Sequence, residues 1–71
     1  MPQPTTTLPH VRAWRIHRLL TQAQLAQQAG LHPWTVTTAE ANRPVTLLTA
    51  ERLARALGVT VADLQERDPT P

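Results

Sequence analysis

Few side chains in this chain of 71 residues could carry out chemistry. Ser and Cys are absent, which excludes a Ser nucleophile, a thiolate metal ligand and a disulfide. The acids near the C-terminal end, Glu51, Asp63 and Glu66, have no paired base that would make a catalytic couple. We therefore expect no enzymatic activity and no catalytic residue.

The three histidines, His10, His17 and His32, do not have the spacing of a local metal site. Because no Cys joins them, we expect neither a metal ion nor another cofactor. His32 is better placed to begin a helix, where a protonated imidazole can donate a hydrogen bond to a phosphate group.

The positive charge of the chain is concentrated before its first acid. Seven Arg against five acids give a formal charge of +2, which is compatible with binding nucleic acid but does not require it. Arg12, Arg15 and Arg18 are three residues apart and all precede Glu40. This spacing favours a solvated helix face with one structural ion pair, and Arg12 is the residue best placed to reach a phosphate.

The two ends of the chain are rich in Pro, and residues 1–8 also in Thr. We predict a flexible arm at 1–8, a domain at 9–66 and a flexible tail at 67–71. No apolar run is long enough to span a membrane, and the start lacks the apolar region of a signal peptide. We expect a cytoplasmic protein with no membrane partner.

Helix signals divide the domain regularly. The two Gly and the single Asn each follow a helical pattern, and these residue types best tolerate the left-handed conformation that ends a helix. Helix starts are indicated by capping boxes at Thr21–Gln24 and Thr60–Asp63, by Thr46, and by Pro33 in a first turn. We predict helices at 9–18, 22–29, 33–41, 47–57 and 61–66, with no strand between them.

The apolar positions inside these helices recur at spacings of three and four. The fold class is therefore all-α, a compact bundle of five short helices. The side chains expected to face inward are Val11, Trp14, Leu25, Ala26, Ala29, Leu31, Val36, Ala39, Leu47, Ala50, Leu53, Ala54, Leu57, Val59, Val61 and Leu64.

The most informative segment is 21–41, in which two short helices are joined by Gly30-Leu31-His32. A three-residue turn that begins with Gly makes the second helix cross the first steeply, which is a helix-turn-helix. Ala26 allows the helices to approach closely, and Leu31 and Val36 are expected to fill the angle between them. This arrangement projects the start of helix 33–41 outward, where it can enter a major groove of DNA.

The run TQAQLAQQAGLHPWTVTTAE at 21–40 resembles the helix-turn-helix of the phage repressor and Cro-like (XRE) family. The matching positions are Thr21-Gln22, Leu25-Ala26, Gly30-Leu31, Val36 and Glu40, and the likeness extends from Arg15 to LARALGVTVADL at 53–64. It implies a lambda-repressor-like fold that binds double-stranded DNA as a homodimer.

The resemblance also implies roles for individual residues. Base edges in the major groove would be contacted by Trp34, Thr35 and Thr38. Phosphates would be held by Thr21, Gln22 and Arg43, and free N–H groups at a helix N-terminus independently favour an anion beside Thr21 and Gln22. Arg15 and Glu40 match a pair that forms a structural salt bridge between helices.

The expected recognition helix departs from the family pattern. Pro33 stands where a Gln or Arg often contacts a base, and Trp34 stands where a small polar residue is usual. Helix 33–41 has no basic residue, and Ala41 replaces a frequent phosphate contact. Leu19 occupies a position where Gly often ends the first helix, and Ala39 one where a larger apolar residue often packs.

The sequence predicts a sequence-specific transcriptional regulator, most simply a repressor that occupies an operator. One alternative is the antitoxin of a toxin–antitoxin pair, since NRPVT at 42–46 resembles a loop of some antitoxins. Another is a protein-interaction module of the same fold with weak or no DNA binding. In both alternatives Trp34 would anchor the protein partner, and it could also simply be packed in the fold.

Overall fold

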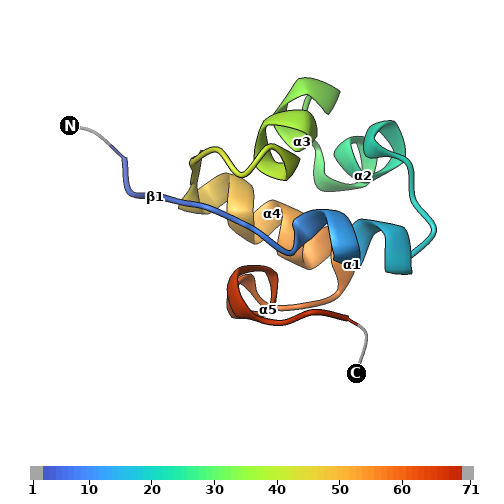
Figure 1. Ribbon diagram of the computed structural model, residues 1–71. Helices are drawn as coiled ribbons and strands as arrows, with labels where there is room; N and C mark the ends of the chain where they lie inside the picture. The colour runs from blue at the N-terminus through green and yellow to red at the C-terminus, as the bar shows by residue number, and fades with distance from the viewer. Residues whose placement is uncertain (1–2, 70–71) are drawn as a thin grey trace.

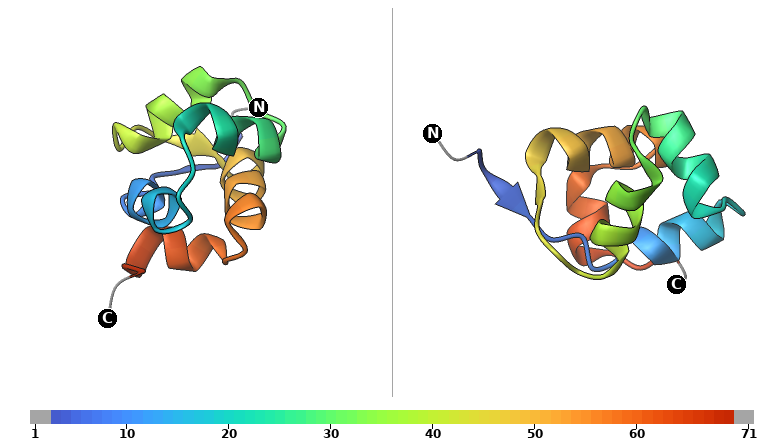
Figure 2. Two further views of the ribbon diagram at one scale, coloured as in Figure 1. Left: turned by 90° about the vertical axis from the view of Figure 1, so that its right-hand side faces the viewer. Right: turned by 90° about the horizontal axis from the view of Figure 1, so that it is seen from above.

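The structure, a computed structural model, describes residues 3–69 as five helices and two short strands. In chain order the elements are β1 (Thr5–Thr6), α1 (Val11–His17), α2 (Gln22–Ala29), α3 (Pro33–Glu40), β2 (Val45–Thr46), α4 (Leu47–Leu57) and α5 (Val61–Glu66). Helix α4 crosses the middle of the molecule, with α2 and α3 on one side and α5 on the other (Figure 1). Figure 2 shows the same layers from the side, with α1 next to α4. The predicted helical bundle is confirmed.

The helix starts are capped by the predicted Thr residues. The Thr21 hydroxyl accepts from the Gln24 N–H at 3.0 Å, and the Gln24 side chain accepts from the Thr21 N–H at 2.9 Å. Thr60 and Asp63 form the same reciprocal pair at the start of α5, and the Thr46 hydroxyl caps α4. These caps satisfy N–H groups that have no partner within a helix.

The predicted left-handed residues also end their helices. Gly30 and Gly58 have φ values of +70° and +72°, and Asn42 has +60°. Leu19 adopts the same conformation, with φ +59°, just beyond α1. The residue type did not predict this, because a Leu in the left-handed region is disfavoured by its Cβ, although the family pattern often has Gly at this position. The helices predicted at 9–18 and 33–41 are shorter in the structure, at 11–17 and 33–40, and the other three agree.

The N-terminal segment packs on the domain, where the sequence predicted a flexible arm and no strand. Thr5 and Thr6 pair antiparallel with Thr46 and Val45, and the Gln65 amide donates to the Thr6 hydroxyl at 2.7 Å. Leu8 is 1% exposed and belongs to the core. The prediction of no strand was wrong, because β-branched Thr and Val suit extended backbone even in a two-residue pairing. The packed unit therefore begins before residue 9.

The core agrees with the predicted inward set except at its edges. Leu47 is 40% exposed, so its prediction as an inward residue was wrong. As the first residue of α4 it lies beside β2, and Val45 is buried there instead. Trp14 packs against the core and is partly buried, and its indole N–H donates to the Arg67 carbonyl at 2.9 Å. This bond ties residue 67 of the predicted tail to α1, while residues 70–71 lie outside the described part.

Residues 3–69 contain neither a membrane-spanning helix nor a metal-ligand cluster. None of their helices is both long and apolar enough to cross a bilayer. Their His, Asp and Glu side chains form no cluster of three or more that could hold a metal ion.

Candidate nucleic-acid interface

The turn between α2 and α3 has the geometry predicted for a helix-turn-helix. Gly30 is left-handed in open space, so its requirement for glycine comes from the backbone and not from crowding. The Leu31 N–H then donates to the Ala26 carbonyl at 2.8 Å, which closes the end of α2. Ala26 and Val36 are fully buried in the core, and Leu31 packs against that core. The two helices are therefore held rigidly at their crossing.

The first turn of α3 is capped by an imidazole. Nδ1 of His32 accepts from the Trp34 N–H at 3.0 Å, and Pro33 is the first helical residue. Because Nδ1 serves as an acceptor, the ring carries its hydrogen on Nε2. Any hydrogen bond from His32 to a phosphate therefore comes from Nε2 and needs no second proton, whereas the sequence-based interpretation assumed a protonated ring.

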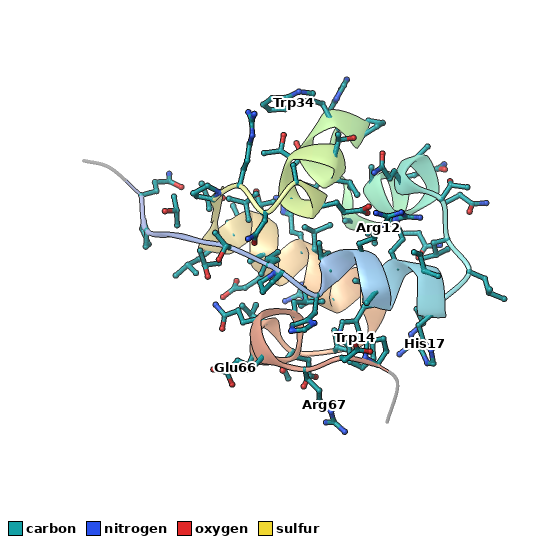
Figure 3. The ribbon with its side chains drawn as sticks, in the orientation of Figure 1. Arg12, Trp14, His17, Trp34, Glu66 and Arg67 are labelled. Atoms are coloured by element: carbon teal, nitrogen blue, oxygen red, sulfur yellow. The ribbon has the colours of Figure 1, made fainter. Side chains whose placement is uncertain are left out.

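The outward face of α3 is formed by Trp34, Thr37, Thr38 and Ala41. These residues are spaced at i, i+3, i+4 and i+7 and therefore lie along one side of the helix. Trp34 is 65% exposed, at the end of the molecule opposite Trp14 (Figure 3). Together with Arg43 they line a hollow of about 250 Å³. We call these five residues the recognition face.

Two of the three predicted base-facing residues belong to the recognition face, and the third does not. Trp34 and Thr38 belong to it, whereas Thr35 does not line the hollow, although Thr35 and Thr38 are both half-buried. Thr37 belongs to the face but was missed by the sequence analysis, which took its base-facing residues from the family pattern. The sequence could have indicated Thr37, because residues three apart lie on the same side of a helix and Thr37 is three residues after Trp34.

Both Thr hydroxyls of the recognition face donate within the protein. The Thr38 hydroxyl donates to the Trp34 carbonyl at 2.9 Å. The Thr37 hydroxyl donates to the Gln22 amide oxygen at 3.0 Å, with the Pro33 carbonyl also near at 3.3 Å. Since each hydroxyl has one hydrogen, the two side chains present to solvent only acceptor lone pairs and methyl groups.

Arg15 and Glu40 form a buried ion pair that joins α1 to α3. The Arg15 Nε lies 2.5 Å from Glu40 Oε2, and Nη2 lies 3.0 Å from Oε1. The two side chains are only 13% and 6% exposed. The remaining guanidinium nitrogen, Nη1, donates to the Leu20 carbonyl at 2.8 Å. The hydrogen bond to Glu40 raises the pKa of Arg15 above its ordinary value, against the opposing effect of burial.

Gln22 connects this ion pair to the recognition face. Its Nε2 donates to Glu40 Oε1 at 3.1 Å, and its Oε1 accepts from the Thr37 hydroxyl. Because Glu40 can only accept, this contact also determines which end of the Gln22 amide is nitrogen. The predicted phosphate ligand Gln22 therefore has one side-chain N–H left, together with its backbone N–H at the start of α2.

The predicted phosphate-binding arginines lie at the surface. Arg43 is exposed just beyond α3, where its N–H donates to the Thr38 carbonyl at 3.3 Å. Arg12 is exposed on α1. Thr21 is exposed as well, and its hydroxyl oxygen accepts the cap bond from the Gln24 N–H, which still allows the hydroxyl to donate to a phosphate. The structure therefore leaves the two Arg side chains and the first turn of α2 accessible to an anion.

Comparisons with known proteins agree with this geometry. Residues 11–64 match the family described as helix-turn-helix. Among solved structures, the hypothetical transcription factor NHTF from Neisseria superposes with a TM-score of 0.69 at 30% sequence identity, over 92% of this chain and 83% of that one. No curated protein matches the chain significantly. Since the family match runs from the start of α1 into α5, this chain belongs to the XRE-type helix-turn-helix family.

Proposed function

We propose that this protein is a sequence-specific transcriptional regulator of the cytoplasm that binds double-stranded DNA through α3. The observation that carries the proposal is the recognition face, an exposed side of α3 that begins at Trp34 and ends beside Arg43. An α-helix presented in this way fits the major groove. The likeness to NHTF, described as a hypothetical transcription factor, supports the same role.

Phosphate contacts would set the position of α3 in the groove. In this proposal Arg43 contacts the backbone beyond the end of α3, and Arg12 contacts it from α1. The first turn of α2, at Thr21 and Gln22, receives another phosphate through backbone N–H groups and the positive end of the helix dipole. Such contacts fix register, while base-facing side chains select the sequence.

A single copy of this domain would cover one half-site. We therefore propose a homodimer on a near-palindromic operator, with half-sites about one helical turn apart. The simplest outcome is repression, because a dimer on an operator excludes polymerase from the same DNA. Its action is binding and not catalysis.

The test is selection of duplexes from random sequence, followed by affinity measurements over a range of salt. Contact with three or four phosphates per subunit predicts a log–log slope of about −3 per subunit. Arg12→Gln and Arg43→Gln should each make the slope shallower by about 0.9, and Arg52→Gln, on the exposed side of α4, should leave it unchanged. Absence of duplex binding at about 50 mM salt, where phosphate contacts are strong, would overturn the proposal.

A second candidate is a protein-interaction role, which the 65% exposure of Trp34 favours. Exposed aromatic residues often anchor protein interfaces. The antitoxin form of this proposal relies on 42–46, and the structure uses Val45 and Thr46 of that segment in pairing with β1. A toxin or other partner whose capture is abolished by Trp34→Ala, while duplex binding stays intact, would favour this candidate over DNA binding by α3.

A further inference from the structure

The hollow on the recognition face offers a ligand both apolar groups and the guanidinium of Arg43. Its lining residues contribute the Trp34 indole ring, the methyl groups of Thr37 and Thr38, and the Ala41 methyl group, with Arg43 at the end of the helix. Its volume of about 250 Å³ is several times the roughly 30 Å³ that a water molecule occupies in the liquid. The edge of a base with a methyl substituent therefore fits in it.

The hydrogen bonds around the hollow restrict what it can recognise. Guanine O6 and N7, adenine N7 and thymine O4 are acceptors in the major groove and need a donor from the protein. The Thr37 and Thr38 hydroxyl hydrogens are already donated to Gln22 and to the Trp34 carbonyl. Two side chains that often supply such donors are therefore unable to do so here.

The orientation of Thr38 strengthens this argument. A Thr in a helix that donates to the carbonyl four residues earlier turns its hydroxyl back along the helix, which leaves its methyl group on the opposite branch of Cβ. The bond from Thr38 to Trp34 has this form, at 2.9 Å. The methyl group of Thr38 is thereby available to the hollow beside the indole ring.

We propose that this hollow reads the C5-methyl group of thymine in the major groove. Among the four bases only thymine carries a methyl group there. The wall formed by Trp34, Thr37, Thr38 and Ala41 has no hydroxyl hydrogen left to donate, so it discriminates by contact, and Arg43 is the remaining donor at its end. This inference rests on the proposed function, since it assumes that α3 enters the groove. In this proposal Trp34 and Thr38 supply most of the base specificity of α3, and Thr37 and Ala41 form the rest of the wall of the hollow.

The experiment replaces each thymine of the selected duplex in turn by deoxyuridine, which removes only the methyl group. At one thymine of each half-site, affinity for the full-length protein should fall about four-fold, the effect of burying one methyl group. A cytosine analogue with the same substituent, 5-methylcytosine, should bind better at that position than cytosine does.

Variants then identify the residues that sense the methyl group. Trp34→Ala and Thr38→Ser should remove the difference between thymine and deoxyuridine, whereas Thr38→Val keeps the methyl group and should retain it. Leu48→Ala, an exposed apolar change on α4, is the matched control and should also retain it.

The outcomes separate this inference from the proposed function. Duplex binding in which no deoxyuridine weakens affinity would overturn methyl recognition and leave the proposed function intact. Discrimination confined to G·C pairs and lost in Arg43→Ala would overturn it as well, in favour of readout by the guanidinium. A protein that binds no duplex at all would overturn both.

Discussion

Gln22 of α2 and Thr37 of α3 are hydrogen-bonded across the helix-turn-helix, with the Thr37 hydroxyl donating to the Gln22 amide oxygen at 3.0 Å. Gln22 is itself oriented by Glu40, which is held by Arg15. One chain of contacts thus runs from a buried ion pair to the surface proposed to meet DNA. Because the hydrogen bonds are directional, each partner limits the orientation of the next.

Gln22→Ala should lower stability by about 1.5–3 kcal/mol, the contribution of a hydrogen bond to a charged group, because the variant loses the bond to the Glu40 carboxylate. The loss of the bond to Thr37 adds little, because the Thr37 hydroxyl can turn to the Pro33 carbonyl, which is already 3.3 Å away. Urea denaturation measures the change. Gln27→Ala, on the exposed side of the same helix, is the control and should change stability by less than about 0.5 kcal/mol. Equal effects of the two substitutions would show that the bonds of Gln22 to Glu40 and Thr37 contribute nothing to stability.

Arg15→Met should destabilise the domain by about 3–5 kcal/mol, because Glu40 would be left as a buried charge without its partner. A domain of this size has a total stability of roughly 4–10 kcal/mol, so this variant is expected to be partly unfolded. The double variant Arg15→Met, Glu40→Leu should recover much of the loss, since it removes both charges. Denaturant unfolding of all four proteins in this cycle gives the coupling, and additive effects would contradict a direct interaction between the two residues.

The helices were predictable from the sequence because their ends depend on local chemistry. A left-handed residue at Gly30 and a reciprocal cap at Thr21 need only a few neighbouring residues, and both types of signal can be read without knowing the fold. The pairing of Thr5 with Thr46 is different. It joins positions far apart in the chain through two residues each, so no periodic pattern marks it, and the burial of Leu8 follows from that pairing.

The candidate interface was predictable only in outline. The family pattern places Trp34 and Thr38 on α3, and the structure puts both on its outward face. The role of Thr37 and the internal use of the hydroxyl hydrogens depend on side-chain orientation, which the helical period does not determine. The contact between Gln22 and Glu40 likewise depends on the crossing of two helices.

Leu8→Ala should destabilise the domain by about 2–5 kcal/mol, because it removes a fully buried side chain and leaves a cavity. This prediction distinguishes the packed N-terminal segment from the flexible arm expected from the sequence. Thr7→Ala, an exposed change one residue earlier, is the control and should have an effect within about 0.5 kcal/mol. Thermal unfolding monitored by circular dichroism compares the two. A Leu8→Ala protein as stable as its control would favour the flexible arm.

Leu19→Gly should stabilise the domain, against the usual effect of introducing glycine. Leu19 is left-handed, with φ +59°, and 89% exposed, so glycine relieves the backbone conformation while little packing is lost. The left-handed region disfavours a residue with Cβ by roughly 1–2 kcal/mol, and the greater freedom of glycine in the unfolded chain offsets part of this. The net gain is therefore expected to be up to about 1 kcal/mol in urea denaturation. Arg52→Gly changes an exposed residue in the interior of α4. It should lower the stability of the domain by about 1 kcal/mol, the opposite of the effect expected at Leu19. If both substitutions destabilise to the same extent, Leu19 is not held in the left-handed conformation in solution.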